Sequence, residues 1–148
     1  MPIEIIGTVY QGNGLYGDFE YMIKSGKYEN SLFIFNDNEI SHQTCDKGRG
    51  NAIIRKYNRF SSLDKPYSAG IVTGEKPIKN GGYRRFDLDT KQKIDECITE
   101  IKLLIEKNKY ERIFYSAEEE NGVIGTSIFK VDIGVLNYIT QEIWKLTN

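Results

Sequence analysis

Residues 31–38 read SLFIFNDN, and their pattern is the strongest indication of the fold. The run from Leu32 to Phe35 is apolar without interruption, and the polar segment Asn36-Asp37-Asn38 ends it abruptly. An unbroken apolar run of this length is typical of a strand that is covered on both faces, as in a parallel sheet. We therefore expect a buried strand here, followed by a polar loop.

Strand-like and helix-like segments alternate along the rest of the chain. Further strands are expected at residues 3–10, 68–74 and 112–116, and helices at residues 18–24, 51–58, 91–108 and 133–146. The clearest helix is 91–108, because apolar side chains recur at helical spacing from Ile94 to Ile105, and Asp89 or Thr90 can cap its start. The alternation predicts an α/β fold with three layers, in which helices flank a mostly parallel central sheet.

Length, charge and hydropathy exclude several classes of protein. The 148 residues fit one domain, 1–148, and 20 Lys+Arg against 21 Asp+Glu leave a net charge of -1. That balance argues against binding of long nucleic acid, which usually needs a basic excess. No apolar run approaches the roughly 20 residues that cross a bilayer, so no membrane partner is expected. The first residues lack the features of a signal peptide, so we expect a cytoplasmic protein.

The chain is poor in residues that hold metals or act as nucleophiles. His42 is the only histidine, and the two cysteines, Cys45 and Cys97, belong to no CxxC pair. From this spacing we expect neither a zinc site nor a histidine-based pair or triad within one chain. No cofactor is expected. His42 itself is either an exposed or structural residue or a ligand contact.

Three loops that follow expected strands are candidates for a binding site. They are the segment Asn36-Asp37-Asn38, the segment Gly48-Arg49-Gly50-Asn51, and the segment 120–129 with Gly122, Gly125, Thr126 and Ser127. Ligands of open α/β sheets collect at the carboxyl ends of the strands, and glycine-rich helix starts offer backbone N–H groups to phosphate. The alternative for each loop is an ordinary polar or glycine turn.

Arginine and tyrosine side chains near glycines extend this candidate site. Arg49, Arg55 and Arg84 suit phosphate recognition, and Tyr10, Tyr16 and Tyr83 lie in or beside glycine loops, where a nucleotide base could stack on them. A solvated loop is an equally good explanation of Arg84. The high tyrosine and phenylalanine content is compatible with a homo-oligomer.

The order of the three loops resembles the macro domain, an α/β module that binds ADP-ribose and related nucleotides. Residues 32–38 are similar to its first asparagine-containing segment, 48–54 to its glycine-rich helix start, and 114–129 to its later phosphate loop. The chain also resembles a divergent macro-like group of bacteriophage and bacterial genomes, through residues 32–38 and the segment 69–74, which contains Thr73. The resemblance implies a three-layer macro-like domain.

We carry three functional hypotheses from these observations. The first is a module that binds a small nucleotide-type ligand, related to ADP-ribose or to a cyclic nucleotide signal, without turnover. A more specific version of this hypothesis is a phage protein that sequesters an immune second messenger and so counters host defence. The second is a macro-type ADP-ribosyl hydrolase or phosphatase, in which Asn36, Asp37 or Asn38 positions water or a ribose hydroxyl. The third is a protein-interaction module without a ligand. The absence of a convincing acid–base set favours binding over catalysis.

Overall fold

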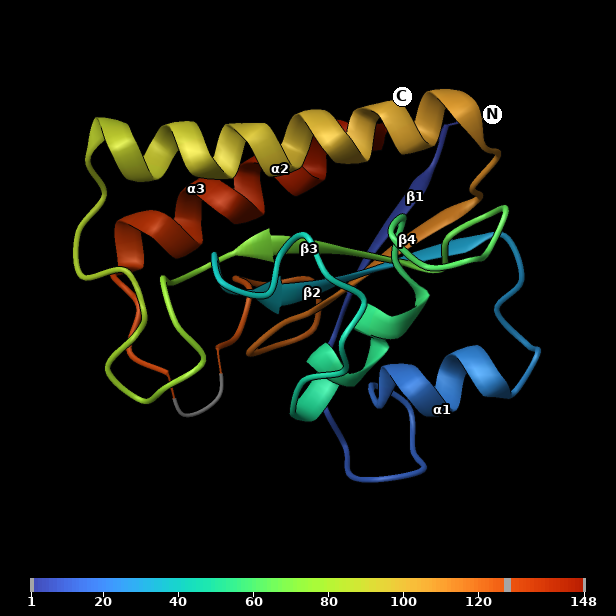
Figure 1. Cartoon of the computed structure of the whole chain (residues 1–148). Coiled ribbons are helices and arrows are strands. Elements are labelled where there is room, and N and C mark those ends of the chain that lie inside the picture. Colours follow the sequence, from blue (N-terminus) through green and yellow to red (C-terminus); the bar gives the residue numbers. More distant parts are fainter. Residues whose placement is uncertain (1, 127–128, 148) are drawn as a thin grey trace.

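A four-stranded sheet forms the middle layer of the molecule, with helices on both of its faces (Figure 1). The computed structural model describes residues 2–126 and 129–147. In chain order the elements are β1 (Glu4–Thr8), α1 (Phe19–Lys24), β2 (Ser31–Asp37), the 3-10 helix η1 (Gly50–Tyr57), β3 (Ser68–Val72), α2 (Leu88–Lys107), β4 (Arg112–Ser116), α3 (Ile133–Trp144) and the 3-10 turn η2 (Lys145–Thr147).

All strand pairs of this sheet are parallel, which confirms the predicted fold class. The strand order is β1-β4-β2-β3, so β2 is central and β1 and β3 are edge strands. Phe33 of β2 lies opposite Phe114 of β4 and Ser68 of β3. The apolar run that we assigned to a doubly covered strand is indeed buried on both faces, and the carboxyl ends of all four strands share one edge of the sheet.

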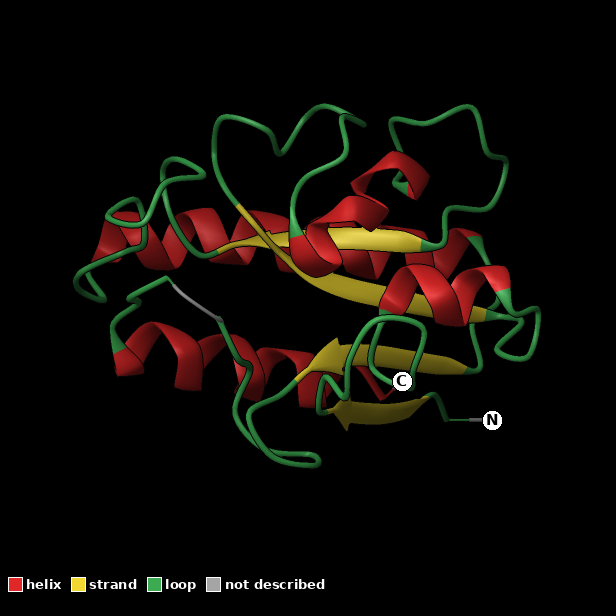
Figure 2. Ribbon diagram, turned by 90° about the horizontal axis from the view of Figure 1, so that it is seen from below, coloured by secondary structure: helices red, strands yellow, loops and turns green. Residues whose placement is uncertain are grey.

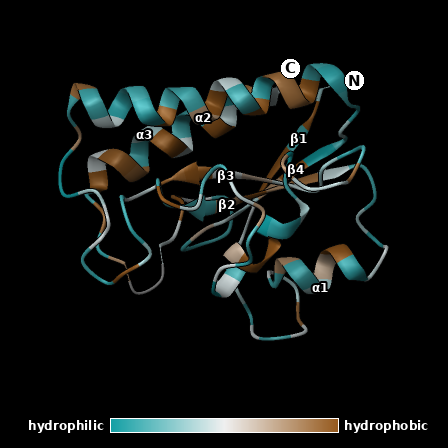
Figure 3. Cartoon of the chain, viewed as in Figure 1, coloured by the Kyte–Doolittle hydropathy of each residue, from teal (hydrophilic) through white to brown (hydrophobic). Residues whose placement is uncertain are grey.

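Two hydrophobic cores lie on opposite faces of the sheet because successive strand side chains point to opposite sides. Leu32 and Ile34 belong to the larger core, under α2 and α3. Phe33 and Phe35 belong to the smaller core, under α1 and η1, where the rings of Phe33 and Phe114 stack at a centroid distance of 4.9 Å. Figure 2 shows the face with α1 and η1, and Figure 3 shows the apolar side of α2 turned toward the sheet.

Two local expectations need correction. Helix α2 begins at Leu88, earlier than expected, because the carboxylate of Asp87 rather than Asp89 or Thr90 caps it by accepting from the Thr90 N–H at 2.9 Å. The helix after Gly48 is a 3-10 helix, not an α-helix. The glycines at 48 and 50 indicated where a helix starts, and a helix start of this kind does not distinguish the two helix types.

The two ends of the described chain meet beside the sheet. The N–H of Ile3, just before β1, donates to the carbonyl of Thr147 in η2 at 2.8 Å. Among the helices of the described residues, none has the length and apolar character that a bilayer crossing requires.

Candidate functional site

A buried aspartate at the carboxyl end of β2 organises the most charged part of the interior. The side chain of Asp37 is 1% exposed. Its Oδ1 accepts from the Nε and Nη2 of Arg55, at 3.0 and 2.7 Å, and from the backbone N–H of Asn38 at 2.9 Å. Its Oδ2 lies 2.8 Å from Nδ1 of His42. Four hydrogen bonds therefore compensate for the burial of this charge.

The cation that faces Asp37 is equally buried. Arg55 projects from η1, and its side chain is 4% exposed. Its Nη1 donates to the carbonyl of Asp46 at 2.9 Å, and its guanidinium lies 5.5 Å from the ring centre of Phe35. The ion pair thus ties η1 and the preceding loop to the end of the central strand.

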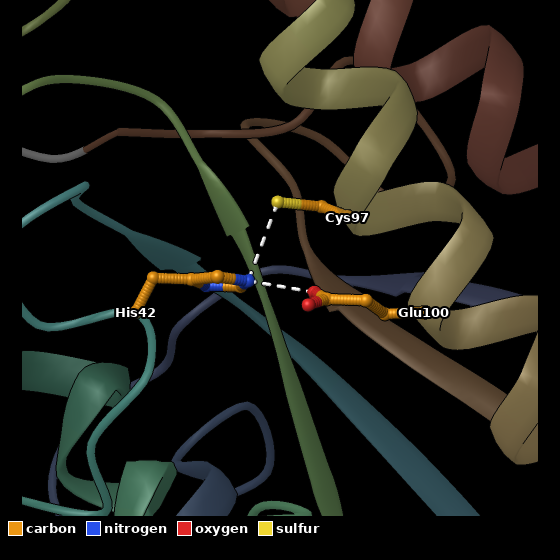
Figure 4. Close-up of side chains that lie close together, drawn as sticks. All are labelled: His42, Cys97 and Glu100. Carbon is orange, nitrogen blue, oxygen red and sulfur yellow. Dashed lines mark hydrogen bonds and ion pairs between the residues drawn. The ribbon is translucent and has the colours of Figure 1, made fainter.

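His42 continues this network from Asp37 to α2. Its Nε2 lies 2.7 Å from Oε1 of Glu100 and 3.6 Å from Sγ of Cys97 (Figure 4). Burial of the ring lowers the pKa of His42, but the hydrogen bonds to Asp37, Cys97 and Glu100 outweigh this effect and raise the pKa from 6.5 to about 12. His42 is therefore an imidazolium held between two carboxylates.

Glu100 is the outer carboxylate of the network. Burial raises its pKa, but the hydrogen bond and charge of His42, together with Arg59, outweigh burial and leave the pKa below its ordinary value of 4.5. Its Oε2 accepts from Nη2 of Arg59 at 2.8 Å. We call the five residues Arg55, Asp37, His42, Glu100 and Arg59 the charge chain, since each contacts the next and their charges alternate in sign.

The charge chain passes beside edge strand β3. A cavity of about 20 Å³ lies there, and His42, Arg59 and Glu100 line it together with the strand residues 68–70. This volume is enough for one water molecule and too small for an organic substrate.

The expectation that the single histidine takes part in no pair within one chain is wrong. His42 has a carboxylate on each ring nitrogen, and the Cys97 thiol is close to Nε2. The order Cys97–His42–Asp37 has the residue types of a thiol-activating triad. An imidazolium cannot accept the thiol proton, however, so the ligand-free arrangement does not generate a nucleophile. His42, Cys97 and Glu100 are instead the group within residues 2–126 and 129–147 that could hold a metal ion.

Gly70 in β3 makes room for the Asp37 carboxylate. A Cβ at this position would lie 2.4 Å from Asp37 Oδ2. We expect Gly70→Ala to lower the free energy of unfolding by roughly 1–3 kcal/mol, because the carboxylate must leave its place between Arg55 and His42. Urea denaturation measures this loss. Gly125→Ala is the control, since its Cβ would meet no atom closer than 3.5 Å; equal stability of the two variants would contradict the prediction.

The structure brings several of the predicted site residues together at the carboxyl edge. The N–H of Thr73 donates to the Asp37 carbonyl at 3.0 Å. Asn36 donates through Nδ2 to the carbonyl of Gly125, while its buried Oδ1 has no partner among the described residues. Asn38 is buried beside them and accepts from the Ser41 N–H. The first loop, Thr73 and part of the third loop therefore meet where the chain leaves β2 and β4.

The second predicted loop lies elsewhere, against the start of α1. The side chain of Asn51 accepts from the Phe19 N–H at 3.0 Å and donates to the Gly17 carbonyl at 3.2 Å, so it holds the loop after β1. The Gly48 N–H donates to the Ala52 carbonyl. Gly50 has a φ of 57°, a left-handed conformation that favours glycine.

The N–H groups of the third loop are engaged within the protein. Gly122 donates to the Glu119 carbonyl at 2.8 Å and Gly125 to the Ser116 carbonyl at 2.9 Å, so neither N–H is free for a phosphate in this conformation. The Thr126 hydroxyl donates to the Phe129 carbonyl. Ser127 lies outside the described residues.

Two of the three candidate arginines are on the surface. Arg49 and Arg84 are exposed. Neither takes part in the charge chain, whose buried arginine is Arg55.

A wider hollow opens beside the start of η1. Its volume is about 490 Å³, and it is lined by Tyr10, Asn13, Asp18, Glu20, Tyr21, Lys24, Gly50, Asn51 and Ile53. We call it the tyrosine hollow. Its volume falls within the roughly 300–1,000 Å³ of small-molecule sites.

Sequence reasoning missed the partners of His42. Cys97 and Glu100 lie 55 and 58 positions from the histidine, inside a helix whose pattern indicated only a buried and a solvated face. Cys97 and Glu100 are three residues apart and so lie on one side of a helix. This spacing is the one signal in the sequence that could have indicated that the two side chains act together.

Comparison of the chain with protein-family models, with curated proteins and with solved structures finds no match.

Proposed function

We propose that the protein binds a small nucleotide-type ligand whose nucleoside part lies in the tyrosine hollow. The observation that carries this proposal is the hollow of about 490 Å³, which combines two half-exposed tyrosines with the glycine-containing start of η1. Gly50, Asn51 and Tyr10, all candidates from the sequence, meet there although the chain separates Tyr10 from Gly50 by 40 positions.

The lining supplies the contacts that a nucleoside needs. Tyr10 and Tyr21 are 48% and 40% exposed, so their rings have free faces on which a base can stack. A carboxylate can accept hydrogen bonds from ribose hydroxyls, as acidic residues do in dinucleotide sites. Asp18 and Glu20 can take this role through the lone pairs that their internal hydrogen bonds leave over.

The charge of the hollow limits the phosphate content of the ligand. Asp18 and Glu20 face a single lining cation, Lys24, while Lys56 lies just behind Glu20 at 2.6 Å. The first N–H groups of a helix have no helical partner, so those of Gly50 and Asn51 add partial positive charge at the start of η1. A phosphate would therefore bind at the η1 side, away from the two carboxylates.

A thermal-shift panel tests the proposal. The ligands are adenosine, AMP, ADP-ribose, cyclic ADP-ribose, NAD and cyclic di- and trinucleotides. We expect at least one to raise Tm, and Tyr10→Ala and Tyr21→Ala each to weaken its binding roughly 10- to 100-fold, because base stacking on an aromatic ring contributes about 1–3 kcal/mol.

Tyr67→Ala is the matched control, since Tyr67 is 41% exposed but lies outside the hollow. A ligand that binds Tyr10→Ala as tightly as the natural sequence would place its site elsewhere, and a panel without any shift would contradict the proposal. Chromatography of the bound ligand separates the remaining hypotheses: recovery of intact ligand supports sequestration, whereas released ADP-ribose supports hydrolysis.

A further inference from the structure

Three potential metal ligands meet at the middle of the charge chain. They are Nε2 of His42, Sγ of Cys97 and Oε1 of Glu100, and all lie within 4.8 Å of one another. Cys97 and Glu100 are one helical turn apart on α2, while His42 approaches from the loop after β2 (Figure 4). Two segments that lie far apart in the sequence thus bring their ligand atoms together.

The distance between sulfur and nitrogen suits a tetrahedral cation. A metal with bonds of roughly 2.3 Å to sulfur and 2.0–2.1 Å to nitrogen separates those two ligands by about 3.6 Å. The Sγ–Nε2 distance here is 3.6 Å. The Nε2–Oε1 distance of 2.7 Å has to widen by roughly 0.7 Å, which a rotation of the Glu100 carboxylate can supply.

Neighbouring residues already orient two of the three ligands. Asp37 accepts from Nδ1 of His42 and so turns Nε2 toward the other two ligand atoms. A carboxylate on the far nitrogen of a ligating histidine is a common support of zinc sites. Arg59 binds Oε2 of Glu100 and leaves Oε1 directed at His42.

We propose that His42, Cys97 and Glu100 bind a divalent cation of the zinc class, with Asp37 and Arg59 as positioning residues. Thiolate, imidazole and carboxylate together select zinc over calcium or magnesium. The cation takes the place of the proton on Nε2 and of the thiol proton, and both protons leave to solvent. The cavity of about 20 Å³ lined by His42 and Glu100 has room for one water molecule as the fourth ligand.

Cobalt and zinc titrations of the chelator-treated protein test this site. We expect Co²⁺ to produce a thiolate-to-metal absorption band at one equivalent, and Zn²⁺ to displace it and to raise Tm. Cys97→Ser should abolish the band. Cys45→Ser is the matched control because Cys45 is the other free cysteine and is exposed, so it should bind Co²⁺ as the natural sequence does.

Two further variants keep the test decisive if Cys97→Ser fails to fold. Glu100→Gln should weaken Zn²⁺ binding at least 10-fold through loss of a charged ligand, and Arg59→Ala about 10-fold through loss of ligand orientation. The proposal is overturned if the natural sequence gives no Co²⁺ band, if the band disappears in Cys45→Ser instead of Cys97→Ser, or if Glu100→Gln binds Zn²⁺ with unchanged affinity.

Discussion

Asp37→Ala is expected to lower the free energy of unfolding by about 3–5 kcal/mol. The substitution leaves the guanidinium of Arg55, whose side chain is 4% exposed, without its carboxylate partner, and it also removes the acceptor at Nδ1 of His42. Small domains are stable by only about 5–15 kcal/mol, so this loss is a large part of the total. Urea denaturation followed by circular dichroism measures it.

The control for this prediction is Asp64→Ala, which removes an exposed loop carboxylate and should change stability by less than about 0.5 kcal/mol. The double variant Asp37→Asn with Arg55→Met should recover part of the loss, since no unpaired guanidinium then remains buried. If the Asp37→Ala protein were as stable as the Asp64→Ala control, the prediction would be contradicted, and the ion pair of Asp37 and Arg55 would have to be hydrated in solution.

The metal-free protein is expected to lose stability steadily as the pH rises above 6.5. The folded pKa of His42, about 12, exceeds the ordinary value of 6.5, so the folded state holds this proton when the unfolded state has lost it. The contribution is complete well below pH 6.5 and disappears as the pH rises toward the folded pKa, at up to about 1.4 kcal/mol for each pH unit. Denaturation in the presence of a chelator, between pH 6 and 9, measures the slope.

Because the chain has one histidine, the origin of this slope can be assigned. His42→Gln should be less stable than the natural sequence at pH 6, and the difference should shrink as the pH rises. The groups that face the ring are Asp37, Glu100 and Cys97, with Arg55 and Arg59 behind the two carboxylates. An imidazole NMR signal that titrates near pH 6.5 in the folded protein would contradict the proposed imidazolium.

Local patterns predicted the elements of this fold because each depends on neighbours in sequence. The apolar run from Leu32 to Phe35 indicated a doubly covered strand, and the spacing from Ile94 to Ile105 indicated a helix with one buried face. The alternation of these patterns was enough for a parallel α/β sheet. It also predicted that the loops after the strands share one edge, where Asn36 meets Gly125.

The candidate site was harder to predict from the sequence, because its chemistry depends on contacts between distant segments. Arg55 was a candidate to neutralise phosphate, yet it is the buried partner of Asp37. Glu100 lies on the solvated side of its helix pattern, but the loop after β2 brings His42 against it. The periodicity of neighbouring residues cannot predict such a contact, since the contact follows from the strand order and from the path of a loop.

The position of the charge chain beside β3 has a consequence for self-association. An edge strand presents unpaired backbone groups that can template pairing with another chain, and β3 is an edge strand whose five residues are all buried. The partly exposed side chains of His42, Glu100 and Arg59 lie beside residues 68–70 of this strand, and ionic groups at a sheet edge oppose the docking of a foreign strand. We expect the residues that stabilise one molecule also to disfavour the joining of sheets from neighbouring molecules.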